Sequence, residues 1–311
     1  MILLDMKISA LVTKRFERHV KNGKFTKDII STFSDAIKHN VVFNAMSTMP
    51  DGSISECLEK CVVLIDILLD DDNLLSLEIL KNNCIINFED FPKKISDENI
   101  FKSMFINLSK VIQKGTGAGE LLMPLLFKNY HFTSKKDEND GISENGEMRF
   151  EIKKAGGQFA SKLVLNKNNN IDIDSLNETY FDGKCLSNQK DFLKLWSNID
   201  FADLQKYFEN IWPSKDKNDI NELVESLKDV KSYQDFAEIY GLWGLKEYKK
   251  VDGFTNMTII EPDTLEIFNI FDFNDNKFLS NLSFTPVLSR GGDTNAIPDG
   301  YLKITKKRTI Q

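Results

Sequence analysis

The chain has 311 residues and a net charge of −7, with 41% apolar and 28% charged residues. This composition is ordinary for a folded protein and excludes general disorder, and no apolar run approaches the ~20 residues that cross a bilayer. The acidic balance also excludes a protein that coats nucleic acid by bulk charge, although it allows a local basic groove.

The opening segment, residues 1–21, has an acid within its short apolar part and its basic residues afterwards. A secretory signal has the opposite order, so we expect a soluble, cytoplasmic protein without a membrane partner. Usage rich in Lys, Asn and Ile is typical of an AT-rich genome and is compatible with a phage protein in a host cytoplasm, but it does not identify the host.

The predicted elements change along the chain. Apolar residues at three- and four-residue spacing predict mainly helices over residues 1–112, with a break at the acidic segment 69–73. Glycines then interrupt the chain before a helix over about 120–129, a hairpin, and a strand near 160. Residues 188–250 are predicted to be helical, with three tryptophans in packing roles, and the segment after 250 favours strands. The plan is α+β in three regions: 1–112, 113–187 and 188–311.

The segment 139–158, "NDGISENGEMRFEIKKAGGQ", predicts a β-hairpin. Asn145-Gly146 favours a two-residue type I′ turn, because both central residues of that turn need φ > 0. This turn sets a register that opposes Asp140 directly to Glu151. The two-residue period of a strand then places Arg149, Glu151 and Lys153 on one face and Met148, Phe150 and Ile152 on the other.

Two directly opposed carboxylates repel each other, and a divalent cation reverses the sign of that effect. Mg²⁺ takes oxygen ligands and often uses one or two carboxylates together with substrate phosphate and water. A lysine two residues after the second acid can hold the attacking water or the phosphate. Asp137 and Glu138 are rival acids, but the same register would place Asp137 opposite Lys154, away from Glu151.

These residues resemble the catalytic signature of the PD-(D/E)XK nuclease superfamily, which has the restriction-endonuclease-like fold, and a phage-type member in particular. The resemblance covers about residues 112–165, with Asp140 as the metal-binding acid and "EIK", residues 151–153, as the acid-x-Lys. Asn139 stands where the nominal pattern has proline.

The resemblance implies a small mixed sheet flanked by helices and a Mg²⁺-dependent endonuclease, with Mn²⁺ as a substitute and DNA as the substrate. Glu120 in "GTGAGELL" matches a further metal or water ligand on the helix before the hairpin, and Gln158 in "GGQ" follows the strand. The substrate-binding candidates are Gln158, Lys154, Gly119 and Arg290, the last beside two glycines that can form an anion nest. A homodimer is compatible with this interpretation.

Other interpretations stay open. The hairpin can be a charged surface element with a chance acid-x-Lys, and "GTGAGE" echoes a phosphate loop without its following GK[ST]. Cys57 and Cys61 lack further zinc ligands at short spacing and favour buried free thiols. The competing function is a non-catalytic nucleic-acid-binding or assembly protein, such as a virion subunit, that keeps the nuclease-like fold.

Overall fold

The structure is a computed structural model in which the chain forms two compact units. The first unit comprises Met1–Gly156 and Asp252–Asp272, and the second comprises Gly157–Val251 and Phe273–Gln311. The residues described are 7, 10–15, 17, 59, 62–63, 65–67, 70–96, 101–102, 105–106, 119–120, 122–133, 140–154, 160–164, 172–212, 215–261, 264–288 and 301–307.

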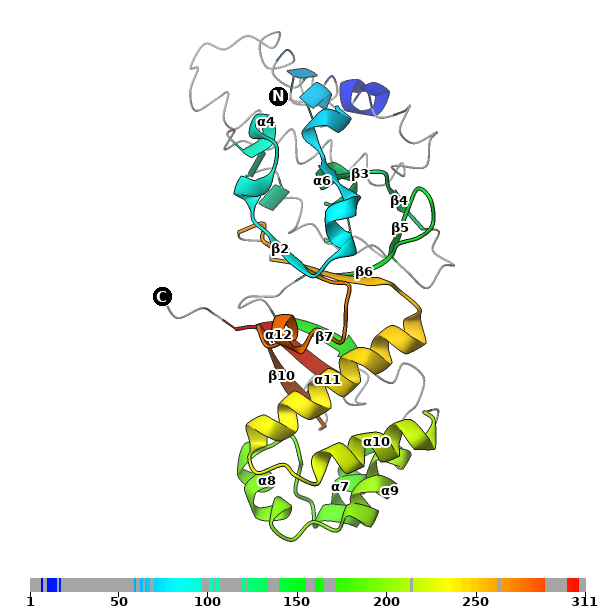
Figure 1. The fold of residues 1–311 in the computed structure, drawn as a ribbon, viewed down its shortest axis with the longest axis vertical. Helices are drawn as coiled ribbons and strands as arrows, with labels where there is room; N and C mark the ends of the chain where they lie inside the picture. The colour runs from blue at the N-terminus through cyan, green and yellow to red at the C-terminus, as the bar shows by residue number, and fades with distance from the viewer. Residues whose placement is uncertain are drawn as a thin grey trace. The chain divides into compact units, whose positions relative to one another are not determined.

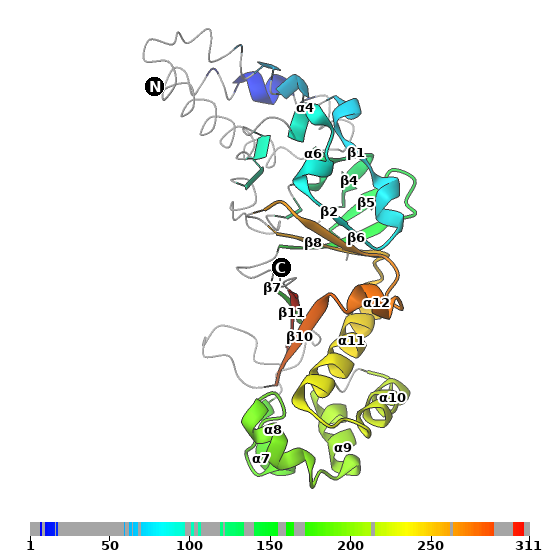
Figure 2. The same cartoon turned by 60° about the vertical axis from the view of Figure 1, so that its left-hand side comes forward.

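A six-stranded mixed sheet organises the first unit, in the order β2-β9-β8-β6-β5-β4 (Figures 1 and 2). Neighbouring strands are antiparallel except for β6 and β8, which run parallel. The strands are β2 (Cys84–Ile86), β4 (Tyr130–Phe132), β5 (Gly141–Ser143), β6 (Arg149–Lys154), β8 (Asn256–Ile260) and β9 (Ile267–Ile270). The predicted α+β class is therefore confirmed, and β6, the strand with the acid-x-Lys, lies inside the sheet.

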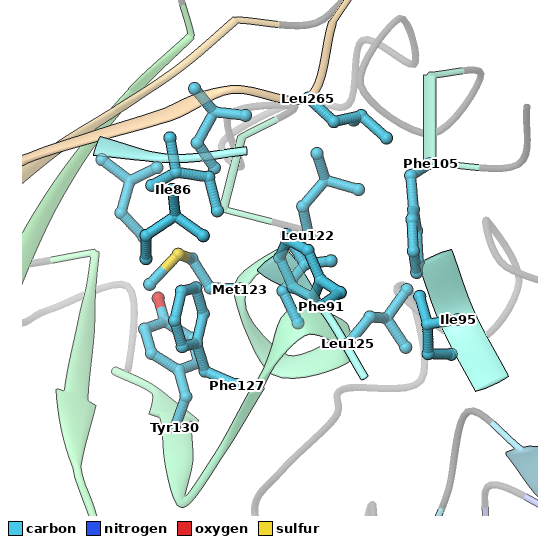
Figure 3. Packing of buried hydrophobic residues seen from close by; sticks show 14 of the residues in the cluster. Ile86, Phe91, Ile95, Phe105, Leu122, Met123, Leu125, Phe127, Tyr130 and Leu265 are labelled. Carbon is cyan, nitrogen blue, oxygen red and sulfur yellow. The ribbon is translucent and has the colours of Figure 1, made fainter. Parts of the chain in front are cut away.

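One face of this sheet carries the apolar core of the first unit. Met148, Phe150 and Ile152 belong to the core cluster, as the two-residue period of the strand predicted. Short helix α6 (Met123–Leu126) and strand β3 (Phe127–Lys128) add a run of buried side chains. Figure 3 shows this cluster, with Met123 and Tyr130 close together.

The predicted helix beyond the acidic break at 69–73 is wrong. Residues 71–96 instead form η1 (Asp71–Asn73), β1 (Leu75–Ser76), η2 (Leu77–Lys81), β2, η3 (Phe88–Asp90) and the four-residue helix α4 (Lys93–Ser96), and β1 pairs with β3 in parallel. The reason is long-range hydrogen bonding that an apolar period does not reveal. Asn256 and Asn269 donate to the Leu80 carbonyl at 2.6 and 2.9 Å, and Asn269 also donates to that of Asn82 at 2.9 Å.

The second unit contains a series of helices, which confirms the helical prediction for residues 188–250. They are α7 (Ile173–Phe181), α8 (Gln189–Trp196), α9 (Phe201–Ile211), α10 (Lys217–Leu227) and α11 (Tyr233–Asp252). The side chains of Asp172, Asn188, Asp200 and Asp216 cap the first four helices. Trp212 is buried and lies 5.0 Å from Trp243 between ring centroids, and Trp196 stacks on Phe192 at 4.7 Å, so the tryptophans have packing roles.

A three-stranded antiparallel sheet, in the order β10-β11-β7, completes the second unit together with the short helix α12 (Asn276–Leu279). Its strands are β7 (Ala160–Val164), β10 (Leu282–Val287) and β11 (Tyr301–Lys306), where strands were predicted. Helix α11 lies against this sheet (Figures 1 and 2), and a Cβ added at Gly241 would lie 2.1 Å from the Phe284 ring. Glycine is what permits this close approach.

The two units do not follow the three consecutive regions expected at 1–112, 113–187 and 188–311. Strands β8 and β9, which come from the C-terminal region, complete the sheet that contains β6.

No helix among the described residues is long and apolar enough to span a membrane.

The buried amide of Asn269 gives the first testable prediction. Asn269→Ala leaves the Asn82 carbonyl and the Thr258 hydroxyl without a buried partner, so the first unit should lose about 2–4 kcal/mol of stability. Hydrogen exchange of peptides spanning β8 and β9, measured in increasing denaturant, reports on this unit separately from the second. The exposed Asn218→Ala is the control, and equal protection in both variants would contradict the prediction.

Candidate functional site

The hairpin of β5 and β6 has the predicted register but a different turn. The ladder pairs Gly141 with Phe150 and Ile142 with Arg149, as expected. Gly146 takes a φ of 74°, whereas Asn145 does not have positive φ, so the type I′ turn is wrong. The Asn145 side chain accepts hydrogen bonds from the Ser143 hydroxyl at 2.7 Å and the Glu147 amide at 3.2 Å, which stabilises another turn around it.

Asp140 lies immediately before β5 and contacts β6 in two ways. Its amide donates to the Phe150 carbonyl at 2.9 Å, and its Oδ2 accepts from the Ile152 amide at 2.6 Å. These bonds hold Asp140 alongside the backbone on either side of Glu151. The expected direct ladder pair of Asp140 and Glu151 is not formed, because the ladder between β5 and β6 begins at Gly141.

Glu151 and Lys153 form an ion pair within β6. The Glu151 side chain is 6% exposed and that of Lys153 is 25% exposed, so the carboxylate is buried and the ammonium keeps access to solvent. In the parallel ladder between β6 and β8, Glu151 pairs with Met257 and Lys153 pairs with Ile259. Phe150 lies at an alternate position of β6 and belongs to the apolar core on the other face of the strand. Burial of a carboxylate requires such a partner.

Tyr130, on β4, contacts Asp140. Its hydroxyl donates to the Asp140 carbonyl at 3.3 Å. Burial raises the pKa of Tyr130 well above its ordinary value near 10, and the negative charges of Asp140 and Glu120 raise that pKa further. Both carboxylates therefore lie within electrostatic range of one buried phenol.

Gly141 makes room for that phenol. A Cβ added at Gly141 would lie 2.0 Å from the Tyr130 hydroxyl oxygen, so any larger residue would displace the ring from Asp140. Sequence reasoning did not identify Tyr130, because a tyrosine in a short strand carries no signal of what its hydroxyl contacts.

The structure describes some of the remaining candidates. Gly119 is buried and Glu120 is half-buried, in a turn before α6, so the predicted helix over about 120–129 is wrong: α6 ends at Leu126 and strand β3 follows. Lys154 is the last residue of β6. The other candidates lie outside the described residues: Asp137, Glu138, Gln158, Arg290, Cys57 and Cys61.

Among the residues that the structure describes, no three or more His, Cys, Asp or Glu side chains form a group that could hold a metal ion. A site that uses two carboxylates together with substrate oxygen and water does not need such a group. Cys84 is half-buried and donates to the Ile79 carbonyl, and burial raises the pKa of its thiol to about 11. That thiol is a structural group rather than a metal ligand.

Comparisons of the chain with models of known protein families, with curated proteins and with solved structures found no match.

The environment of Tyr130 predicts a pH dependence. The unfolded chain releases the phenol proton near pH 10, and the folded chain holds it to higher pH, so this contribution to stability is fully present below about pH 10 and is lost as the pH rises further. Buried tyrosines ionise when the protein unfolds at alkaline pH, and the absorbance of tyrosinate then increases. In Tyr130→Phe this increase should be smaller by about one tyrosinate. The remaining increase comes from Tyr207 and Tyr240, whose pKa values are also raised by burial. An unchanged amplitude in Tyr130→Phe would contradict this account.

Proposed function

We propose that the protein is a Mg²⁺-dependent endonuclease that hydrolyses phosphodiester bonds in DNA. The observation that carries the proposal is the position of Asp140, whose carboxylate is hydrogen-bonded at 2.6 Å to the amide that follows Glu151, on the strand that also presents Lys153. Two acids and a lysine are thus gathered on one short piece of the sheet.

The donor set fits the metal. Asp140 and Glu151 supply hard carboxylate oxygens of the kind that Mg²⁺ takes, and water and a substrate phosphate oxygen would complete the shell. When bound, Mg²⁺ would supply positive charge beside the scissile phosphate. Mn²⁺, which also suits carboxylate and water ligands, would substitute for it.

Lys153 would act on the attacking water and the phosphate. Its ammonium is the more exposed member of the pair with Glu151, and it lies on the same strand as that acid. A compact cation at this place can orient the water and stabilise the negative charge that grows on the phosphorus oxygens in the transition state.

The six-stranded sheet supports a restriction-endonuclease-like core within the first unit. Strands β4, β5 and β6 form an antiparallel meander, and β8 then pairs in parallel with β6. This is a small mixed sheet in which the acid-x-Lys strand has partners on both sides. A strand in that position is held rigidly, as an active site requires.

A second candidate function has its own supporting observation. Lys153 already neutralises the buried Glu151, and the Asp140 carboxylate already accepts from β6, so each charge has an intramolecular role without a metal. A non-catalytic nucleic-acid-binding or assembly protein could keep these residues for stability alone.

Cleavage assays separate the two functions. Purified protein should cut supercoiled, linear or single-stranded DNA with Mg²⁺ or Mn²⁺ and leave it intact in EDTA, and RNA in the same assay tests the choice of substrate. Lys153→Ala should lower the single-turnover cleavage rate by about 10²–10³, the scale of one preorganised electrostatic group. Lys153→Arg should not restore the rate, because a planar guanidinium does not replace a compact ammonium.

The control for this assay addresses folding. Lys153→Ala leaves the buried Glu151 carboxylate uncompensated and can destabilise the sheet. The double variant Glu151→Gln, Lys153→Met replaces the charged pair by a neutral one, and it should fold but remain inactive. Full cleavage by folded Lys153→Ala protein would remove the nuclease proposal.

Metal binding gives an independent prediction. Mg²⁺ should raise the melting temperature of the wild type by mass action, and the double variant Asp140→Asn, Glu151→Gln should lose that increase. Differential scanning calorimetry with titrated Mg²⁺ measures it. The double variant Glu144→Gln, Asp229→Asn has the same change in charge at two exposed positions and should respond like the wild type. Equal responses in all three proteins would place any metal elsewhere.

A further inference from the structure

The three-stranded sheet of the second unit has two unlike faces. Along β10 the residues alternate between buried and more exposed, and Leu302 and Ile304 of β11 are buried on the same side as Phe284. Helix α11 covers this side, where Gly241 lies against Phe284, and Lys307 just beyond β11 pairs with Glu238 of the same helix at 3.3 Å. The apolar face is therefore already packed.

The opposite face is polar and basic. Ser283, Thr285, Lys303 and Thr305 occupy the alternate positions, and each is at least partly exposed. None of the three strands contains an aspartate or a glutamate, although the whole chain carries a net charge of −7. No carboxylate pairs with Lys303 among the residues that the structure describes.

The register brings two lysines together on this sheet. Lys303 of the central strand β11 is the direct ladder partner of Lys162 on β7. Directly opposed residues share a face, and like charges there destabilise a sheet. An anion bound across the two strands would offset the repulsion between the two lysines. Phosphate groups suit this position, because proteins typically contact them with lysines and with serine and threonine hydroxyls.

We propose that this face, defined by Lys162, Lys303, Thr285 and Thr305, holds the phosphodiester backbone of a nucleic acid. By register, Thr285, Lys303 and Lys162 form a row across three adjacent strands, and at ~4.8 Å per strand this row spans about 10 Å, which is longer than a single phosphate group. The inference deepens the proposed function, on which it rests for the identity of the partner, by assigning a substrate-holding surface that is separate from the cleavage residues on β6.

Binding without cleavage tests the inference. A fluorescently labelled DNA duplex of roughly 20 base pairs is titrated with protein in EDTA, and anisotropy is followed from about 50 to about 200 mM salt. The double variant Lys162→Gln, Lys303→Gln should bind on the order of tenfold more weakly, and its salt slope should fall by about two. Lys162→Arg, Lys303→Arg keeps both charges and should bind like the wild type.

The matched control removes the same charge elsewhere in the second unit. Lys190→Gln, Lys231→Gln changes two exposed helical or loop lysines and should leave affinity and salt slope close to the wild type. Equal weakening in both glutamine pairs would show an effect of bulk charge and overturn the assignment of this face. A wild type that does not bind the duplex would also overturn it.

The outcome is separable from that of the nuclease proposal. Binding that depends on Lys162 and Lys303, in a protein that does not cleave DNA with Mg²⁺, supports this face and removes only the catalytic role. Cleavage that depends on Lys153, in a protein whose affinity ignores the lysine pair, removes this face and keeps the catalytic role. Circular dichroism of each variant confirms that the sheet still folds.

Discussion

Asn269 makes four hydrogen bonds in the buried interior of the first unit, and the position of the acid-x-Lys strand depends on the network around it. Its Nδ2 donates to the carbonyls of Leu80 and Asn82, and its Oδ1 accepts from Thr258 and Asn256. Each of these groups is costly to bury alone, and together they satisfy one another. The network therefore joins the segment before β2 to the central strands β8 and β9.

The same network reaches the start of β6. The Thr255 hydroxyl lies 2.7 Å from Asn256 Oδ1 and accepts from the Arg149 amide at 2.8 Å, while the Thr255 amide donates to the Arg149 carbonyl at 2.9 Å. Arg149 is thereby fixed beside β8, and the strand period then determines where Glu151 and Lys153 lie. The site residues are local in sequence, but their placement depends on amides more than a hundred residues away.

This dependence explains which predictions succeeded. The alternation in β6 and the register of its hairpin were predictable, because they follow from neighbouring residues and from the ordinary geometry of a strand. The type I′ turn failed because the Asn145 side chain bonds locally, and the helix beyond residue 73 failed because distant asparagines bond its carbonyls. The contact of Tyr130 with Asp140 has no counterpart in any sequence pattern.

The ion pair between Glu151 and Lys153 gives the two candidate functions different physical requirements. A purely structural pair keeps its lysine on the carboxylate permanently, since separation would leave the buried Glu151 charge without compensation. Under the proposed nuclease function, Lys153 must leave that carboxylate to reach water and phosphate, and a cation at the acids would replace the positive charge that departs. The greater exposure of Lys153 fits this exchange, because moving an ammonium that is already partly solvated costs less free energy than moving one that is fully buried.

Asp140 does not compete with Glu151 for Lys153, since its Oδ2 accepts a hydrogen bond from a backbone amide that has no charge to neutralise. The two acids would therefore contribute differently: Asp140 as a fixed ligand, and Glu151 as the ligand whose release from Lys153 couples metal binding to the positioning of the lysine.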